Sequence, residues 1–359
     1  MGTALVKREL GDVADDWTRL AHHSASPFVT YEWLSCWWTA FGRGEPRWLL
    51  VCEEDGSLAA GALLEGDRGT ALSSAANVHS GDWDAVARDE RARMELWDAL
   101  GNLGANCVTL HGIPEDAGRA DAAGAALRSA GYRIVQEQGA LSPWLDLPAT
   151  WEELMQRTSR NLRSQLGRRQ RALEREGTLT LRTVADPAEV NQELERFLQL
   201  EASGWKGRAG TAILSDPRTE RLYRDFAQAA ASRGWLRIYS LELDGQLIAG
   251  DYGCSFAGTG FLIKTAFSET HERFSPGVVL RAKILQAAIQ EGLTSYDFLG
   301  GPEHYKQRWA SALRPRVRIW AYRGTALPRY AYRSRIYPVL RDRISPVVKL
   351  ARARVRRLR

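Results

Sequence analysis

The sequence predicts an α/β fold built from two similar halves, and three observations support this prediction. Helical and strand-like segments alternate along the 359 residues, a length typical of two domains. Two Asp-Gly turns, at Asp55 and Asp244, each lie between apolar runs and predict β-hairpins. These hairpins are 189 residues apart, and two later Gly-x-Pro-Glu motifs, at Gly112 and Gly300, are 188 apart. Two matches in the same order favour an internal duplication.

The first half is predicted to alternate between helices and strands. Trp33, Trp37 and Phe41 recur at helical spacing, so we expect a helix over residues 31–41 that ends at Gly42. The other predicted segments are helices over 88–102 and 120–131 and strands over 48–52, 58–64, 107–111 and 132–136. Two prolines within 142–148 predict a linker. We therefore expect one unit over 1–148 and a second over 149–325.

The second half repeats this order of elements. It begins with a long arginine-rich helix, predicted over 151–176 and ended by Gly177. The segments after it are predicted as strand 179–184, helix 189–201, helix 217–233, hairpin 235–250, strand 261–267, helix 277–291 and strand 295–299. The remaining residues, 326–359, are predicted to form a basic amphipathic tail.

The net charge of +6 is distributed unevenly along the chain. Residues 329–359 carry 11 Lys or Arg and one acid, whereas the other 328 residues carry 38 basic and 42 acidic side chains. Apolar residues recur every three or four positions within this tail, a pattern that suits docking on an anionic membrane surface. A basic tail without a partner explains the pattern equally well.

Several classes of protein are disfavoured by the absence of their motifs. The six histidines form no metal-binding cluster, so no metal is expected. P-loop, serine-hydrolase and dinucleotide-binding motifs are also missing. Four scattered cysteines, no apolar run of about 18 residues and no signal sequence predict a cytoplasmic protein. The tail would place it at the inner face of the membrane.

A strand, a loop and a helix within the second half suggest a phosphate-binding turn. The predicted strand 261–267 is followed by Arg273, and Pro276 and Gly277 start the next helix. A helix start exposes backbone N–H groups at the positive end of its dipole, and the arginine adds charge that suits a pyrophosphate. An ordinary turn with proline at the first helical position has the same residues.

The stretch 250–310 resembles the acyltransferase domain of the GNAT type found in CelD-like proteins, named for cellulose biosynthesis. The resemblance lies in the phrases 264–277 and 296–301, in Tyr-Lys-Gln-Arg-Trp at 305–309, and upstream in 201–210. It extends over roughly residues 25–325 and includes similarity to Fem-type peptidyl transferases. The resemblance implies two tandem GNAT-like halves, each a mixed, mostly antiparallel sheet flanked by helices.

The resemblance also implies an activity, which is transfer of an acyl group from acyl-CoA to an amine. The implied acceptor is a sugar or a cell-envelope precursor. Two alternatives stay open: a Fem-type transferase that uses aminoacyl-tRNA, and a scaffold without catalytic activity in polysaccharide synthesis. The donor loop, residues 273–278, is one residue longer than the usual GNAT loop and contains only one glycine. This departure leaves a donor other than CoA open.

Candidate site residues follow from this reaction. Asp251 and Asp297 are the candidate bases, and Tyr305 is the candidate acid. Lys264 interrupts an apolar strand, so it either pairs with one of these aspartates in the site or protects a sheet edge. The residues expected to bind the donor are Thr265, Phe267, Arg273, Ser275, Gly277 and Val278. Those expected to bind substrate are Trp205, Lys206, Lys306 and Arg308.

Seven arginines in the helix predicted over 151–176 form an additional feature. They are Arg157, Arg160, Arg163, Arg168, Arg169, Arg171 and Arg175. A solvated helix explains them, and a surface that contacts RNA or phosphate is the alternative.

Overall fold

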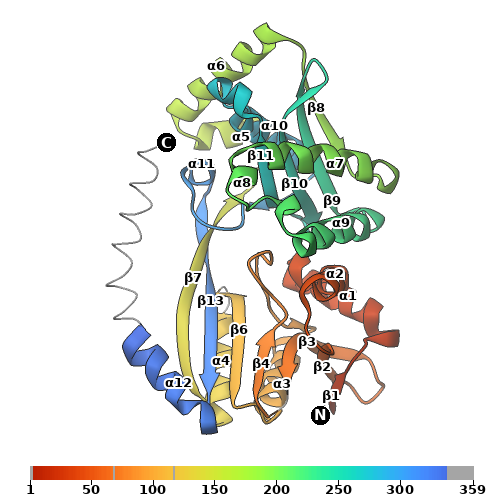
Figure 1. Cartoon of the computed structure of the whole chain (residues 1–359), viewed down its shortest axis with the longest axis vertical. Coiled ribbons are helices and arrows are strands. Elements are labelled where there is room, and N and C mark those ends of the chain that lie inside the picture. Colours follow the sequence, from red (N-terminus) through yellow and green to blue (C-terminus); the bar gives the residue numbers. More distant parts are fainter. Residues whose placement is uncertain (1–2, 68, 116–117, 338–359) are drawn as a thin grey trace.

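The computed structural model describes residues 3–67, 69–115 and 118–337. In these residues the chain forms one continuous sheet that runs through both halves of the molecule (Figure 1). The strand order is β1-β2-β3-β4-β6-β13-β7-β12-β11-β10-β9-β8, and β5 pairs with β3. The part of the predicted tail beyond Tyr337 lies outside the described residues.

The first half supplies the strands at one end of the sheet. These strands are β1 (Thr3–Lys7), β2 (Arg47–Cys52), β3 (Leu58–Asp67), β4 (Ala71–Ser74), β5 (Val86–Ala87), β6 (Cys107–Pro114) and β7 (Arg133–Asp146). Its helices are α1 (Ala14–Ser24), α2 (Tyr31–Phe41), α3 (Glu90–Gly101) and α4 (Arg119–Ser129). The helix predicted over 31–41 is confirmed, because Thr30 caps its start and Trp33 and Trp37 pack into the core.

The second half follows the same plan at the other end. Its strands are β8 (Leu179–Val184), β9 (Leu236–Leu243), β10 (Gln246–Phe256), β11 (Thr259–Phe267), β12 (Ser295–Asp297) and β13 (Ala312–Tyr322). Its helices are α5 (Trp151–Arg157), α6 (Arg160–Glu176), α7 (Pro187–Ser203), α8 (Trp205–Arg208), α9 (Pro217–Ser232), α10 (Pro276–Gln290), α11 (His304–Gln307) and α12 (Leu327–Ala331).

The pairing of strands supports the predicted duplication. β4 pairs in parallel with β6, and β11 pairs in parallel with β12, each over three residues. All other pairs in the sheet are antiparallel, including the Asp-Gly hairpins β2–β3 and β9–β10. The last strands of the two halves are exchanged, because β13 pairs with β6 and β7 pairs with β12. The long β7–β13 pair therefore joins the halves in the middle of the sheet (Figure 1).

Two predicted segments differ from the structure. The linker predicted over 142–148 is mostly strand, because β7 continues to Asp146 and pairs with both β12 and β13. The helix predicted over 151–176 is interrupted, because Ser159 caps a new helix and accepts a hydrogen bond from the Leu162 N–H. The unit boundary at residue 148 stays a prediction.

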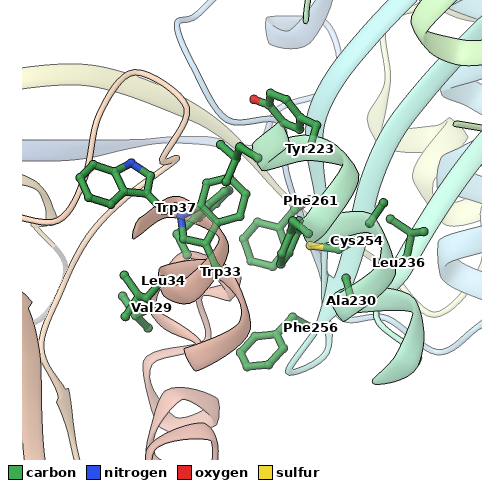
Figure 2. Close-up of a cluster of buried hydrophobic side chains, with 14 of the residues drawn as sticks. Val29, Trp33, Leu34, Trp37, Tyr223, Ala230, Leu236, Cys254, Phe256 and Phe261 are labelled. Carbon is green, nitrogen blue, oxygen red and sulfur yellow. The ribbon is translucent and has the colours of Figure 1, made fainter. Parts of the chain in front are cut away.

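An apolar cluster holds α2 of the first half against α9 of the second (Figure 2). Trp33 and Phe226 pack edge to face with ring centroids 4.8 Å apart, and both are fully buried. Phe28 also packs edge to face on Phe261 of β11, with ring centroids 6.2 Å apart. This packing fixes the first half against the strand β11, around which the cavities described next are arranged.

Candidate functional site

A groove lies beside the free edge of β11. This strand pairs with β10 along most of its length, but with β12 only at Thr259–Phe261. Among the described residues no strand pairs with this edge of β11 beyond Phe261. Its backbone groups, apart from the Thr265 carbonyl that Lys206 binds, are therefore open to an extended ligand. The groove has a volume of about 510 Å³ and is lined by 262–267 of β11 together with Trp205, Lys206 and Tyr305. We call it the β11 groove.

A second cavity, the central cleft, lies between the two halves and has a volume of about 690 Å³. The first half contributes the loop 76–82 and the residues His111 and Gly112. The second half contributes Tyr223, Gly300 and 316–318 of β13. The central cleft and the β11 groove share two lining residues, Ile263 and Lys264.

A β-bulge in β11 lies where the two cavities meet. Tyr252 of β10 pairs with Lys264 and Gly253 pairs with Leu262, which leaves Ile263 as the extra residue. A bulge places two successive side chains on the same face of the sheet and re-aims the local backbone. Ile263 packs against the cluster between the halves, whereas Leu262 packs on the opposite face. The bulge thus turns both Ile263 and Lys264 toward the central cleft.

Lys264 is the most informative of the predicted residues. Strict strand alternation would put Lys264 on the same face as both Leu262 and Ala266, but the bulge separates it from Leu262. Of the two alternatives for Lys264, pairing with an aspartate is wrong, because Asp251 pairs with Arg281 and Asp297 with Arg316. Among the described residues no carboxylate pairs with Lys264.

The electrostatic environment of Lys264 weakens its hold on a proton. Its ammonium lies over the Tyr223 ring, 5.2 Å from the centroid. Burial lowers the pKa of Lys264, and repulsion from Lys206 lowers it further, while Glu201 opposes the shift. A partly buried cation without a carboxylate partner suits a site where negative charge develops.

The two predicted bases lie beside the cavities and do not line them. Asp251 and Arg281 are both nearly fully buried and form an ion pair. Asp297 accepts hydrogen bonds from the Leu299 N–H at 2.8 Å and from Arg316 at 2.8 Å, and also from the Ser142 hydroxyl. Both carboxylates connect parts of the fold, and their roles as bases stay predictions.

Asp82 is a carboxylate of the central cleft that sequence reasoning missed. It lines the cleft, accepts a hydrogen bond from Ser26 and lies 3.6 Å from the guanidinium of Arg316. Burial raises the pKa of Asp82 to about 6, although Arg316 and Ser26 oppose the shift. A pKa near the working pH suits a general base.

Two histidines also line the central cleft. His79 lies 3.2 Å from the Tyr223 hydroxyl and 3.2 Å from the Thr219 hydroxyl, so the loop 76–82 is attached to α9. Burial lowers the pKa of His79 to about 4 and that of His111 to about 4, with nearby cations contributing to both shifts. Both rings are therefore neutral at pH 7, and they supply polar contacts without charge.

The residues predicted to bind the donor divide into two groups. Thr265 and Phe267 line the β11 groove. The others lie at the start of α10, beyond the lining of that groove, and they are Arg273, Ser275, Gly277 and Val278. Arg273 is exposed. Its guanidinium carbon lies 4.4 Å from the centroid of the Phe274 ring, and its Nη2 lies 3.5 Å from the Glu176 carboxylate. The start of α10 has no side-chain cap, and a Cβ at Gly277 would meet nothing within 4 Å.

The residues predicted to bind substrate differ in whether their side chains already have hydrogen-bond partners within the protein. Trp205 is 54% exposed at the groove. The Lys206 ammonium donates to Glu201 at 2.8 Å and to the Thr265 carbonyl at 2.7 Å, so it supports the wall of the groove. Lys306 donates to the Leu299 carbonyl at 2.8 Å, and Arg308 donates to Gln165 at 2.9 Å.

Tyr305, the predicted acid, lines the β11 groove. Its side chain is 39% exposed overall, yet burial of the phenol raises its pKa well above the ordinary value, with Arg281 opposing the shift. The phenol therefore holds its proton at neutral pH and can donate it.

In the described part of the chain, no group of three His, Cys, Asp or Glu residues is placed to hold a metal ion. None of the described helices combines the length and the hydropathy needed to cross a bilayer.

The fold and the groove define the class of this protein. It is an α/β protein in which one large mixed sheet, flanked by helices, runs through two halves of similar plan, and residues 160–307 match the family model described as an acetyltransferase (GNAT) domain. A comparison with curated proteins found no match. GNAT domains use acyl-CoA as a co-substrate.

Solved structures with similar folds cover nearly the whole chain. FemX is 12% identical with a TM-score of 0.60, and the match covers 93% of this chain and 99% of FemX. The C-terminal domain of a putative lysylphosphatidylglycerol synthetase from Agrobacterium fabrum is 16% identical with a TM-score of 0.56, covering 89% and 94%. A protein of unknown function from Bacteroides thetaiotaomicron is 12% identical with a TM-score of 0.60, covering 89% and 100%. At these identities the likeness concerns the fold alone.

Proposed function

We propose that this chain is an N-acyltransferase that transfers an acyl group from acyl-CoA to an amine. The donor's pantetheine arm lies along the free edge of β11, and the acceptor enters through the central cleft. The observation that carries this proposal is that both cavities meet at Ile263 and Lys264, on the bulge of β11. A thioester carbonyl at this bulge is accessible to an amine from the opposite side.

The reaction assigns a task to each group around the bulge. The amine nitrogen attacks the thioester carbon, a C–N bond forms, and the C–S bond then breaks. Backbone N–H groups of the bulge and the Lys264 ammonium stabilise the negative charge on the carbonyl oxygen. Asp82 accepts the proton that the amine loses, and Tyr305 donates a proton to the departing thiolate.

The lining of the central cleft suggests the class of acceptor. Arg318 and Lys264 give the cleft cationic groups, and the histidines beside them are neutral at pH 7. An amine acceptor that also carries a carboxylate or phosphate suits these walls. A sugar or a cell-envelope precursor, as the resemblance to CelD-like proteins implies, meets this requirement when it carries a phosphate or a carboxylate.

Lys264→Met tests the assignment most directly. We expect turnover with acetyl-CoA to fall about 100-fold to 1,000-fold, in the range found when one oxyanion donor is removed. Stability should not fall, because the variant removes a partly buried charge that lacks a carboxylate partner. Lys283→Met on α10 is the control, and equal turnover in the two variants would contradict the proposal. Calorimetry with acetyl-CoA measures donor binding separately.

A second candidate function is favoured by the arginines of α5 and α6. The chain has no acid between Leu154 and Leu173, and six of the arginines lie in this interval. Repulsion from Arg308 and Arg168 adds to burial in lowering the pKa of Arg169. Such a cluster suits a phosphate backbone, as in a transferase that uses aminoacyl-tRNA. Retention of tRNA by the pure protein without acetyl-CoA binding would favour this function, and binding of neither would favour the scaffold.

A further inference from the structure

The outward face of the last described helical segment is both apolar and basic. α12 continues into a π-helical turn over Tyr332–Ile336, and the segment packs on β13 and β7 through its other side. Leu327, Tyr332 and Ile336 are 43%, 48% and 50% exposed. Arg329 and Arg335 are exposed next to them. We call these five residues the α12 face.

Most of the basic side chains around the α12 face have no acidic partner in the part of the chain that the structure describes. Arg329, Arg335 and the neighbouring exposed Arg128 and Arg133 have no carboxylate partner among the residues that the structure describes. Arg333 is held between aromatic rings, 3.3 Å from the centroid of Trp320, and lies 3.6 Å from Glu137. Residues 327–337 contain three arginines and no acid.

Two hollows lie in this region. One has a volume of about 440 Å³ and is lined by Tyr322, Pro328, Arg329, Tyr332 and Arg333. The other has a volume of about 420 Å³ and is lined in part by Arg128, Arg133 and Tyr330. Each hollow thus presents two arginines beside aromatic rings, an arrangement that suits a phosphate group whose chain continues into an apolar layer.

We propose that the α12 face docks on an anionic phospholipid bilayer. Exposed aliphatic and tyrosine side chains insert at the boundary between headgroups and acyl chains, while the arginines contact lipid phosphates. A nucleic acid would use the arginines but offers nothing to Leu327 and Ile336. The sequence that follows this segment is also basic, since residues 338–359 carry eight basic side chains and one acid. Its charge is therefore also opposite to that of an anionic bilayer.

The docking surface leaves the reaction site accessible. α12 lies at the lower end of the long β7–β13 pair in Figure 1, and α6 lies at the opposite end of the molecule. Arg316 and Arg318 of β13 line the central cleft, while Tyr322, at the end of the same strand, lines one of the hollows beside α12. A protein bound through α12 keeps the β11 groove, at the far end of β13, clear of the bilayer.

Flotation of the full chain with vesicles tests this proposal. We expect binding to phosphatidylcholine vesicles that contain phosphatidylglycerol, weak binding to phosphatidylcholine alone, and release by salt. Tyr332→Ser with Ile336→Ser should reduce partitioning about tenfold. The control is Leu5→Ser on β1, which changes an apolar side chain that is 38% exposed and lines neither cavity.

A second pair of variants tests the charge. Arg329→Gln with Arg335→Gln should reduce partitioning about 25-fold, at about fivefold for each charge lost at the surface. Arg160→Gln with Arg168→Gln on α6 is the matched control. Unchanged partitioning in both α12 variants, or an equal loss in the controls, would overturn the proposal. So would binding of duplex RNA without binding of vesicles. Turnover with acetyl-CoA and a small amine is measured in parallel, because the proposal requires it to stay unchanged.

Discussion

The two halves of the molecule share one plan and differ at one edge. In each half, two strands pair in parallel over three residues, β4 with β6 and β11 with β12. β4 ends at Ser74, and the loop after it turns to the central cleft. β11 continues to Phe267 and forms the wall of the groove. The same scaffold thus occurs twice, while the free strand edge that suits a donor lies in the second half.

The helices α3 and α10, which come after these strands, also differ in how their first turns are capped. Asp89 caps α3, and its carboxylate accepts a hydrogen bond from the Ala92 N–H at 2.8 Å. α10 begins with Pro276 after Ser275, whose φ of 51° is left-handed, and no side chain caps it. A carboxylate therefore already occupies the positive end of α3, whereas the end of α10 is open to an external anion.

The largest effect is expected from the buried ion pair of the second half. Asp251→Asn leaves Arg281 buried without its carboxylate, which costs about 3–5 kcal/mol of unfolding free energy. Asp225→Asn is the control, since its pair with Arg221 is exposed and contributes less than about 1 kcal/mol. Urea denaturation measures both variants. A stable Asp251→Asn variant that loses turnover would instead make Asp251 the base that the sequence predicts.

Asp82 tests what the first half contributes to the reaction. Asp82→Asn should lower turnover about 100-fold, the lower end of the range for loss of a general base. The acid limb of the wild-type profile of kcat/KM, with an apparent pKa of about 6, should disappear. An unchanged limb in the variant would remove Asp82 from the reaction and leave the first half as scaffold alone.

The same carboxyl predicts how stability depends on pH. Its pKa is higher in the folded chain than in the unfolded chain, so the folded state binds the proton more tightly. The contribution of Asp82 to stability is therefore present at low pH and is lost as the pH rises from about 4 to about 6. Asp82→Asn should abolish this loss, which melting curves at pH 4 and pH 7 would measure.

Local signals in the sequence predicted much of the fold. The Asp244-Gly245 turn has φ values of 49° and 80°, which this pair adopts readily, and so the hairpin β9–β10 was predictable. The helix over 31–41 followed from the spacing of its tryptophans. The exchange of β7 and β13 was not predictable, because it depends on pairing between strands that are distant in sequence. β1, α1 and β13 were also absent from the predicted elements.

The site was only partly predictable for a related reason. Lys264 interrupts an apolar strand, which drew attention to it, but the bulge at Ile263 that turns it toward the cleft has no sequence signal. Asp82 lies in an irregular loop, and its raised pKa depends on burial that packing between the halves creates. Asp251 was predicted as a base because it lies on a strand, and its pairing with Arg281 depends on how α10 packs.

The smallest of these effects is expected from giving α10 the acidic start that α3 has. Gly277→Asp places a carboxylate near the first turn of α10, where a Cβ meets nothing within 4 Å. The added charge competes with donor phosphates for the same N–H groups, so affinity for acetyl-CoA should fall about tenfold. Gly277→Ala is the control for the loss of glycine, and calorimetry measures both. Equal affinities would mean that the donor's phosphates lie elsewhere, and the two helix starts would then differ without consequence for binding.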